Sequence, residues 1–406
     1  MAESCAWIAS YAEGKGRILV ATKDIYPNQT VLTDSALLSL PDGLPVCLGC
    51  LTPVQSSSPP CPSCSWLSCS DLCPQEENHR LECKILTSAG LRVDIKEFGK
   101  PNILYSVIAI LKTLLFKACL AENPEKYEII ETLMDHWEER RKDLQVGGMV
   151  KYIGALIRKR LGLQHVSDAE VEHVFGVLKT NGVGQGAGRA CYIYPIVSLM
   201  SHACRSNLEI VGTPGTQIQF RAKTHILAGE ELTWSYTSVL DTRSRIRERL
   251  KETWMFECTC SRCSDPTEFG TFFSSTKCAC GGYLVERNEG NICLLCGDKE
   301  NTNIVQESVD LVEQIRLYGS DEIIKLVERL ESNSHYHPSH HIYSRITMRL
   351  LDTCFQSLNE DLILKLKTRG EILLRTLETL LGENSRPYSR YKSILELITN
   401  KHNKSL

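Results

Sequence analysis

Hydrophobic residues occur in short runs in two separated parts of the chain. From Gly16 to Leu40, β-branched and aliphatic residues are interrupted by turn residues, a pattern that predicts short β-strands. Tyr26-Pro27-Asn28 and Pro41-Asp42-Gly43 are the predicted turns. Further strand-like segments are Cys191–Val197, Leu208–Gly212 and Gln217–Ala222. The pattern therefore predicts β-strands before and after a long intervening stretch.

Apolar residues at steps of three and four positions predict helices in the rest of the chain. These steps recur from Lys84 to about Lys179, and they continue after Cys296 to the end of the sequence. Pro338 and Pro387 interrupt the last helical region. Its periodicity fits a small solenoid-like cap of helix pairs and a plain helical bundle equally well.

The longest apolar run, Ile103–Ala121, approaches the length of a membrane-spanning helix. Lys112 lies near its centre, where a charge costs about 2.5–3.5 kcal/mol on insertion scales, and Lys117 adds to this cost. We therefore expect a buried amphipathic helix. Because the first basic residue is Lys15, the N-terminus lacks the positive region of a signal peptide, and we expect no membrane association.

Composition narrows the class of protein. A chain of 406 residues can bury more than one core. Its formal charge of −3 provides no strong field for phosphate backbones, so strong nucleic-acid binding is not expected. Most of the 19 cysteines are clustered, which favours a reducing cytosol or nucleus. The outlying thiols are expected to be buried or free, and they are Cys5, Cys119, Cys191 and Cys354.

The segment from Cys47 to Cys83 contains seven cysteines and one histidine in closely spaced pairs. The pairs are Cys47/Cys50, Cys61/Cys64, Cys69/Cys73 and His79/Cys83. A gap of two or three residues lets one turn present two ligands to the same ion, so the segment predicts two tetrahedral zinc sites. A segment stapled by disulfides is the competing interpretation.

Two more cysteine clusters follow. Cys258, Cys260 and Cys263 provide three thiolates, and Cys204 is the natural fourth ligand from upstream. A further zinc site is predicted at Cys278, Cys280, Cys293 and Cys296, with disordered free cysteines as the alternative. Sites with four protein ligands leave no open position for water, which argues against a zinc hydrolase. The glycine-rich stretch Asn181–Gly188 lacks a preceding strand and a Gly-Lys-Ser/Thr ending, which argues against a phosphate-binding loop.

Four other segments occur in a distinctive order: Gly14–Arg17, Ser198–Asn207, Gly229–Tyr236 and Trp254–Cys260. Together with the cysteine clusters, they resemble the SET and MYND domain (SMYD) lysine methyltransferases over nearly the whole chain. The likeness is to an arthropod-type member with a divergent SET signature. It implies an α+β protein, with a β-rich SET fold that is split by a MYND zinc finger and a helical insert. A zinc-bound post-SET segment and an all-α, helical-repeat-like C-terminal domain would follow.

The resemblance also implies domain boundaries and a pairing of metal ligands. The expected parts are an N-terminal part of SET (1–46), a MYND finger (47–83), a helical insert (84–178), the core SET (179–240), a post-SET region (241–297) and a helical C-terminal domain (298–406). The cross-braced MYND topology implies one zinc on Cys47, Cys50, Cys69 and Cys73 and another on Cys61, Cys64, His79 and Cys83.

In such a family the cofactor is S-adenosylmethionine. By resemblance, the cofactor-binding residues are Lys15, Gly16, Arg17, Asn181, Ser201, His202, Tyr236 and Phe256. Tyr236 corresponds to the catalytic tyrosine, which would orient an uncharged lysine amine toward the sulfonium methyl. His202 has two possible roles, contact with the cofactor or fixing of its turn, and we favour the cofactor.

Three residues depart from the family pattern. Ser201 replaces an asparagine, and the loss of one hydrogen bond to a charged group would cost about 1.5–3 kcal/mol. Trp254 replaces a channel tyrosine, and Ile18 replaces a glycine near the cofactor turn. These departures carry an alternative hypothesis, a catalytically weak or inactive scaffold that recruits partners as a transcriptional corepressor.

The leading hypothesis is a monomeric protein-lysine N-methyltransferase of cytoplasm and nucleus. Its substrate would be a histone or another protein that presents a lysine, with a role in transcriptional regulation. The resemblance also implies proline-containing peptides at the MYND finger and corepressor or deacetylase complexes as partners.

Overall fold

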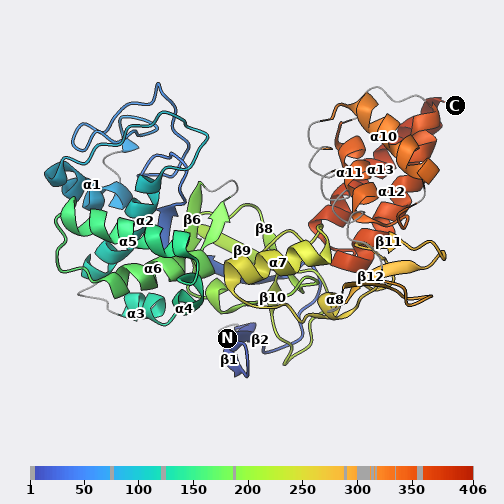
Figure 1. Ribbon diagram of the computed structural model, residues 1–406, viewed down its shortest axis with the longest axis horizontal. Coiled ribbons are helices and arrows are strands. Elements are labelled where there is room, and N and C mark those ends of the chain that lie inside the picture. The colour runs from blue at the N-terminus through green and yellow to red at the C-terminus, as the bar shows by residue number, and fades with distance from the viewer. Residues whose placement is uncertain are drawn as a thin grey trace.

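Figure 1 shows the computed structural model of the chain. It describes residues 5–73, 77–119, 125–185, 189–287, 290–299, 311, 315, 318–333, 335–353 and 360–405. Most strands lie near the middle of the molecule in this view. Helices from the first half of the chain lie on one side of them, and the C-terminal helices lie on the other.

Small antiparallel sheets join the two β-rich parts of the sequence. β1 (Trp7–Ala12) pairs with β2 (Gly16–Ala21), and β1 was not predicted from the sequence. One three-stranded sheet has the order β3 (Thr30–Ser35), β9 (Gln217–Ala222), β8 (Leu208–Val211). Another has the order β4 (Leu38–Pro41), β6 (Ala190–Ile193), β5 (Val183–Gln185). The first and second β-rich regions therefore form one domain.

The intervening stretch is helical, as predicted. It contains α1 (Glu77–Ala89), α2 (Ile103–Cys119), α3 (Glu125–Glu131), α4 (Trp137–Arg140), α5 (Leu144–Lys159) and α6 (Asp168–Asn181). Asp143 caps α5, and Ser167 and Glu170 form a capping box at the start of α6. α1 crosses residue 83, where the MYND finger was expected to end. In the described part of the chain, none of the helices has the length and apolarity needed to cross a membrane.

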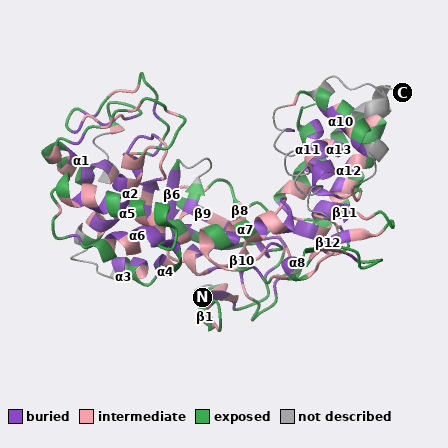
Figure 2. Cartoon of the chain, viewed as in Figure 1, coloured by how far each residue is buried: buried purple, intermediate pink, exposed green. Residues whose placement is uncertain are grey.

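α2 lies at the centre of the largest core, as expected for a buried helix. Ile108 and Leu111 are fully buried there, together with Leu19 of β2 and Phe220 of β9. The cysteine-rich segment shares this core, because Trp66 is 1% exposed and its indole N–H donates to the Leu91 carbonyl at 3.0 Å. Figure 2 shows buried residues on α2 and on the helices beside it.

The segment expected to be the post-SET region, residues 241–297, begins with α7 (Arg243–Trp254) and α8 (Ser261–Ser264). A small sheet follows, with strands β11 (Thr276–Lys277), β12 (Tyr283–Arg287) and β13 (Gly290–Cys293). The last helices are α10 (Ser320–Asn333), α11 (His341–Thr353), α12 (Glu360–Leu381) and α13 (Arg386–Ser405). Each of these four packs on the next, and α13 also contacts α11, an arrangement that fits a helical-repeat-like domain.

Candidate active site and metal centres

Four groups of four ligand atoms come together among the described residues, and within each group all atoms lie within 4.8 Å of one another. The groups are Cys47, Cys50, Cys69 and Cys73; Cys61, Cys64, His79 and Cys83; Cys204, Cys258, Cys260 and Cys263; and Cys278, Cys280, Cys293 and Cys296. These are the same sets that the sequence and the family resemblance predicted. We name them the Cys47, Cys61, Cys204 and Cys278 groups.

The sulfur–sulfur distances in three of these groups are close to those of tetrahedral zinc, and in the Cys47 group they are shorter, 3.3 Å between Cys50 and Cys69 and 3.2 Å between Cys69 and Cys73. Zinc–sulfur bonds of about 2.3 Å place the sulfurs of a tetrahedral site about 3.8 Å apart. The Sγ–Sγ distance is 3.8 Å between Cys61 and Cys83, 3.6 Å between Cys204 and Cys263, and 3.7 Å between Cys278 and Cys296. A disulfide would need about 2.05 Å, and every described cysteine is free. Each group is therefore able to hold zinc.

A buried chain of polar groups orients His79. Its Nδ1 lies 3.2 Å from a carboxylate oxygen of Glu82, and the same carboxylate is 2.9 Å from the Lys112 ammonium. Lys112 reaches this point from the middle of α2 and also donates to the Leu48 carbonyl at 3.2 Å. Burial lowers the pKa of Lys112, although the charge of Glu82 opposes this effect. The ring of His79 is thereby turned so that Nε2 faces Cys64.

The Cys204 group connects the SET strands to the post-SET region. Cys204 follows the short strand β7 (Ser201–His202), whereas its partners surround α8. Hydrogen bonding from Cys204 lowers the pKa of Cys260 to about 6, which favours a thiolate. Between these ligands, the fully buried Arg262 donates to the Val239 and Asp241 carbonyls and pairs with Glu268 at 2.7 Å. The metal group is thus tied to the loop that follows Tyr236.

The segments Ser198–Asn207 and Gly229–Tyr236, which resemble the two SET signatures, meet at β7. The strand β10 (Thr233–Trp234) runs parallel to it, so that Thr233 pairs with Ser201 and Trp234 with His202. Asn207 stabilises this strand pair, because its side chain accepts a hydrogen bond from the Thr233 N–H and donates one to the Glu231 carbonyl, both at 2.8 Å. Tyr236 lies two residues after the end of β10.

Tyr236 is enclosed by aromatic rings. Its ring centroid lies 5.2 Å from Trp234, 5.4 Å from Trp254 and 6.4 Å from Phe256. Burial raises the pKa of its hydroxyl, which therefore stays protonated at neutral pH. The hydroxyl donates to the Met200 carbonyl at 2.6 Å. With its proton committed in this way, the oxygen can offer its lone pairs to a donor in the site.

His202 contacts Tyr236 and the metal group at once. Its Nδ1 accepts the Tyr236 backbone N–H at 3.0 Å, which leaves the proton on Nε2. Nε2 lies 3.3 Å from the Cys204 sulfur. Both nitrogens are thus engaged within the protein, as a turn-fixing role requires, and contact of His202 with the cofactor stays a prediction. The centroid of its ring lies 6.1 Å from that of the Phe256 ring.

A cavity of about 530 Å³ opens beside Tyr236. Asn181 and Trp254 line it, as do the hydroxyl-bearing residues Ser198, Ser235 and Thr237. This volume lies within the range of small-molecule sites. The aromatic rings can attract a cation, and the amide and hydroxyl groups can bind polar ends of a ligand. These donors and ring faces fit a sulfonium cofactor with an amino-acid end.

The residues of the segment Gly14–Arg17 do not line this cavity in the described part of the chain. The ammonium of Lys15 is 2.6 Å from Glu231, and its side chain is 51% exposed. Gly16 has a φ of 80°, which glycine adopts without strain. Arg17 donates to the hydroxyl and carbonyl of Thr132, just beyond α3. Ser201 and Phe256 are half-buried next to His202 and Tyr236, respectively.

Asn181 is held at the end of α6. Its side-chain amide donates to the Met134 carbonyl at 2.8 Å and to the Val177 carbonyl at 3.1 Å, so its oxygen remains available to a ligand. The following Gly182 is required here, because a Cβ at that position would lie 2.2 Å from the Cys191 sulfur.

Some cavity residues were not predicted. Val183 and Gly184 come from β5, within a glycine-rich stretch that sequence reasoning set aside, and Ile210 comes from β8. Trp234 lines the same cavity, and its buried indole N–H has no partner among the described residues. In the sequence, only the position of Trp234 near Tyr236 in the segment Gly229–Tyr236 could have indicated that it lines the cavity.

Of the outlying cysteines, Cys5 is exposed and Cys191 is buried. Burial raises the pKa of Cys191 to about 12. The side chain of Cys119 and the whole of Cys354 lie outside the described residues.

Comparison with known proteins decides the family. A model of the SET domain matches residues 16–237, more than half of the chain. The chain belongs to the SET domain family. This confirms the α+β fold class, and the SMYD relatives below confirm the resemblance noted from the sequence.

Relatives of this SET domain protein are known in plants and animals. It is 26% identical to the histone-lysine N-methyltransferase ASHR1 of Arabidopsis thaliana over 70% of this chain and 62% of that protein. It is 28% identical to the human histone-lysine N-methyltransferase SMYD1 over 62% and 54% of the two chains. The Drosophila melanogaster SET domain-containing protein SmydA-8, isoform A, is 25% identical over 69% and 61%. The chain thus spans less than two thirds of the length of each.

Proposed function

We propose that this chain is an S-adenosylmethionine-dependent protein-lysine N-methyltransferase. The observation that carries the proposal is the buried Tyr236 hydroxyl, which donates to the Met200 carbonyl at the wall of a cavity with polar and aromatic lining. The relatives ASHR1 and SMYD1 bear the name of histone-lysine N-methyltransferase, which supports the same activity. The substrate would be a histone or another protein that presents a lysine.

The residues of the site account for the main requirements of methyl transfer. The cofactor would supply an electrophilic methyl group on a sulfonium. A lysine amine has a pKa of about 10.4 in water, and the apolar walls formed by Trp254 and Val183 would favour its neutral form. The Tyr236 oxygen would accept an amine N–H and so align the nitrogen lone pair with the methyl group. Asn181 lines the cavity and would hold a polar end of the cofactor, whereas Ser201 and the Lys15–Arg17 segment lie outside the described lining and are assigned to the cofactor by the family resemblance alone.

We propose zinc as the metal of all four groups and a structural role for each, since four protein ligands leave no open position. We further propose a cytoplasmic and nuclear location. Proline-containing peptides at the MYND finger, and corepressor or deacetylase complexes, are the partners that the family resemblance supports. An inactive scaffold is not favoured, because Trp254 lines the cavity without closing it.

The test combines binding and activity. We expect isothermal titration calorimetry to detect S-adenosylmethionine, and we expect methyl transfer to protein lysines by mass spectrometry. Tyr236→Phe should reduce transfer by about 100-fold, because an oriented hydroxyl at the reacting centre is lost. Cofactor affinity should remain within about twofold of the parent, since the ring stays in place. No binding at millimolar cofactor, or equal transfer by the two proteins, would refute the proposal.

A further inference from the structure

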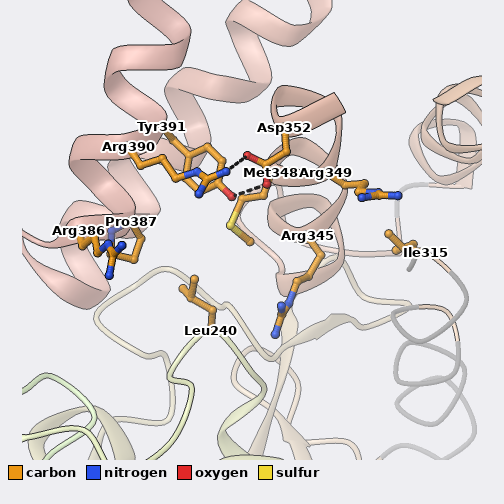
Figure 3. Close-up of a pocket in the computed structure, with 10 residues that line it drawn as sticks. All are labelled: Leu240, Ile315, Arg345, Met348, Arg349, Asp352, Arg386, Pro387, Arg390 and Tyr391. Atoms are coloured by element: carbon orange, nitrogen blue, oxygen red, sulfur yellow. Dashed lines mark hydrogen bonds and ion pairs between the residues drawn. The ribbon is translucent and has the colours of Figure 1, made fainter. Parts of the chain in front are cut away.

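A second cavity lies between the C-terminal helices and the loop that follows Tyr236 (Figure 3). Its volume is about 480 Å³. Met348 of α11, Tyr391 of α13 and Leu240 of the loop supply its apolar surface. The proposed methyl-transfer chemistry uses none of these residues.

Arginines dominate the described lining of this cavity. Arg345 and Arg349 are one turn apart on α11, and Arg386 and Arg390 are one turn apart on α13. Each pair therefore lies on one face of its helix. Figure 3 shows the two pairs on different sides of Met348, with Arg345 extending toward the side where Leu240 lies. We call this site the arginine pocket.

The four arginines of the arginine pocket outnumber the acidic residues of its described lining. Asp352 is the one acidic residue in its described lining, and it pairs with Arg390 at 2.8 Å and accepts the Tyr391 hydroxyl at 3.1 Å. Arg386 and Arg349 are exposed at opposite sides of the pocket. Guanidinium groups bind carboxylates through paired N–H donors, so the surplus suits an acidic ligand.

The arginine pocket is close to Tyr236 along the chain. Thr237 and Ser238 line the cavity at Tyr236, and Leu240, two residues later, lines the arginine pocket. A fully extended chain advances about 3.3–3.6 Å per residue, so Tyr236 and Leu240 are at most about 14 Å apart. Arg249 donates to the Thr237 hydroxyl at 2.9 Å, and Arg262 holds the Val239 and Asp241 carbonyls. The two cavities therefore share one braced loop.

We infer that the arginine pocket binds an acidic segment of the protein substrate, a run of Asp or Glu about four to eight residues from the target lysine. This inference rests on the proposed function and adds a substrate class to it. The apolar floor at Met348 and Tyr391 suits the methylene groups of such side chains. Nucleic acid fits less well, because the basic surface is one confined pocket in a chain of net charge −3 rather than an extended stripe.

Binding tests the arginine pocket without any chemistry. The probe is a fluorescein-labelled peptide with one lysine, a Gly/Ser spacer of about six residues and a run of glutamates. Its twin carries glutamines instead. By fluorescence anisotropy with the full chain, we expect the glutamate peptide to bind about tenfold more tightly, with a preference that weakens as salt is added. Equal binding of the two peptides would overturn the inference.

A charge-reversed variant locates the binding. Arg349→Glu combined with Arg386→Glu should abolish the preference for glutamate, because both residues lie at the edge of the pocket. Arg375→Glu is the matched control, an exposed arginine of α12 that does not line the pocket, and it should keep the preference. Thermal unfolding checks that both variants are folded. Retention of the preference in the double variant, or its loss in the control, would overturn the inference.

Methyl transfer then separates the two proposals. In the parent we expect the glutamate peptide to have a KM about tenfold lower than its twin, with little change in kcat. Equal KM values would overturn the inference. If no peptide or protein were methylated, the proposed function would fail, and the anisotropy experiment would still decide on its own whether the pocket prefers acidic peptides.

Discussion

Single hydrogen bonds at His202 and Tyr236 set the orientation of the proposed active site. His202 accepts the Tyr236 backbone N–H with one nitrogen, and its other nitrogen faces the Cys204 sulfur. The Tyr236 hydroxyl is turned by the Met200 carbonyl. A ligand shift in the Cys204 group would therefore move the histidine and, through it, the backbone of Tyr236.

Ser201 offers the clearest test at the residue scale. Ser201→Asn restores an amide pair next to His202, and one additional hydrogen bond to a charged group stabilises by about 1.5–3 kcal/mol. We therefore expect calorimetry to give a dissociation constant for S-adenosylmethionine that is lower by about tenfold or more. Ser10→Asn, on the exposed face of β1, serves as the control. An unchanged constant in Ser201→Asn would mean that the serine already meets the cofactor's needs.

The sequence predicted the metal ligands and Tyr236 better than the residues that line the cavity. Cysteine spacing indicated the ligand pairs, since ligands on one turn are local features, but the family resemblance was needed to divide the eight ligands of residues 47–83 between two groups. Tyr236 was predictable because its signature is contiguous. Val183, Ile210 and Ser198 could not be assigned to the cavity, because three separate elements bring them together only after folding. The role of His202 depended on side-chain directions that no spacing encodes.

At the scale of elements, α2 holds the cysteine-rich segment through one buried charge. Lys112 pairs with Glu82, and that carboxylate orients His79. The same lysine argued against a membrane span in the sequence, and its partners explain how a buried helix tolerates it.

Lys112→Met should lower the free energy of unfolding by about 3–5 kcal/mol, because Glu82 would be left as a buried charge without its cation. The measurement is chemical denaturation at neutral pH with zinc present. Lys117→Met is the control on the same helix: Lys117 is 46% exposed and pairs with Glu131, so its loss should cost less than about 1 kcal/mol. Similar losses in the two variants would show that the buried pair contributes nothing special.

A buried histidine in the first turn of α11 makes the free energy of unfolding depend on pH. His341 is 3% exposed, and burial lowers its pKa from 6.5 to about 3. Below about pH 6.5 the unfolded chain takes up a proton that the folded chain refuses, so stability falls as the pH is lowered. This contribution is fully present above that pH.

We therefore expect the parent to lose about 2 kcal/mol more stability between about pH 7 and pH 5 than His341→Leu does. Denaturant unfolding at the two pH values measures the difference. Parallel pH profiles for the parent and His341→Leu would contradict this expectation.

Elements were predictable where their pattern was strong. The helices from α2 to α6 follow from apolar periodicity, and β2, β3, β8 and β9 follow from strand-like runs, whereas α1 begins seven residues before the predicted helical region. β1 was missed because its residues are largely exposed. The pairing of β3 with β9 could not be predicted from the residues alone, since register between strands so far apart depends on the packing of the whole core.

At the scale of the whole molecule, the metal groups differ in accessibility. In the Cys61 group Cys61, Cys64 and His79 are buried and Cys83 is half-buried, and Cys204, Cys258 and Cys263 are buried as well. The Cys47 and Cys278 groups each include two exposed cysteines. Chelators reach exposed ligands first, so the groups should lose zinc at different rates.

We expect a chelator to release zinc in two phases, which a colorimetric zinc dye measures. Methyl transfer should decline with the slow phase. The reason is that Arg262 links the Cys204 group to the loop after Tyr236. Cys280→Ser, which disrupts only the exposed Cys278 group, should lose part of the fast phase and retain activity. Activity that disappears with the fast phase would contradict this coupling.

The split of the SET strands has a consequence for synthesis on the ribosome. β3 and β4 are finished by residue 41, but their partners β9 and β6 end at residues 222 and 193. At a translation rate of about 5–20 residues per second, β3 and β4 remain without their partner strands for roughly ten to forty seconds, and their backbone edges stay unpaired. The nascent chain therefore depends on whatever shields those edges, such as a chaperone or the cysteine-rich segment folding early around its metal.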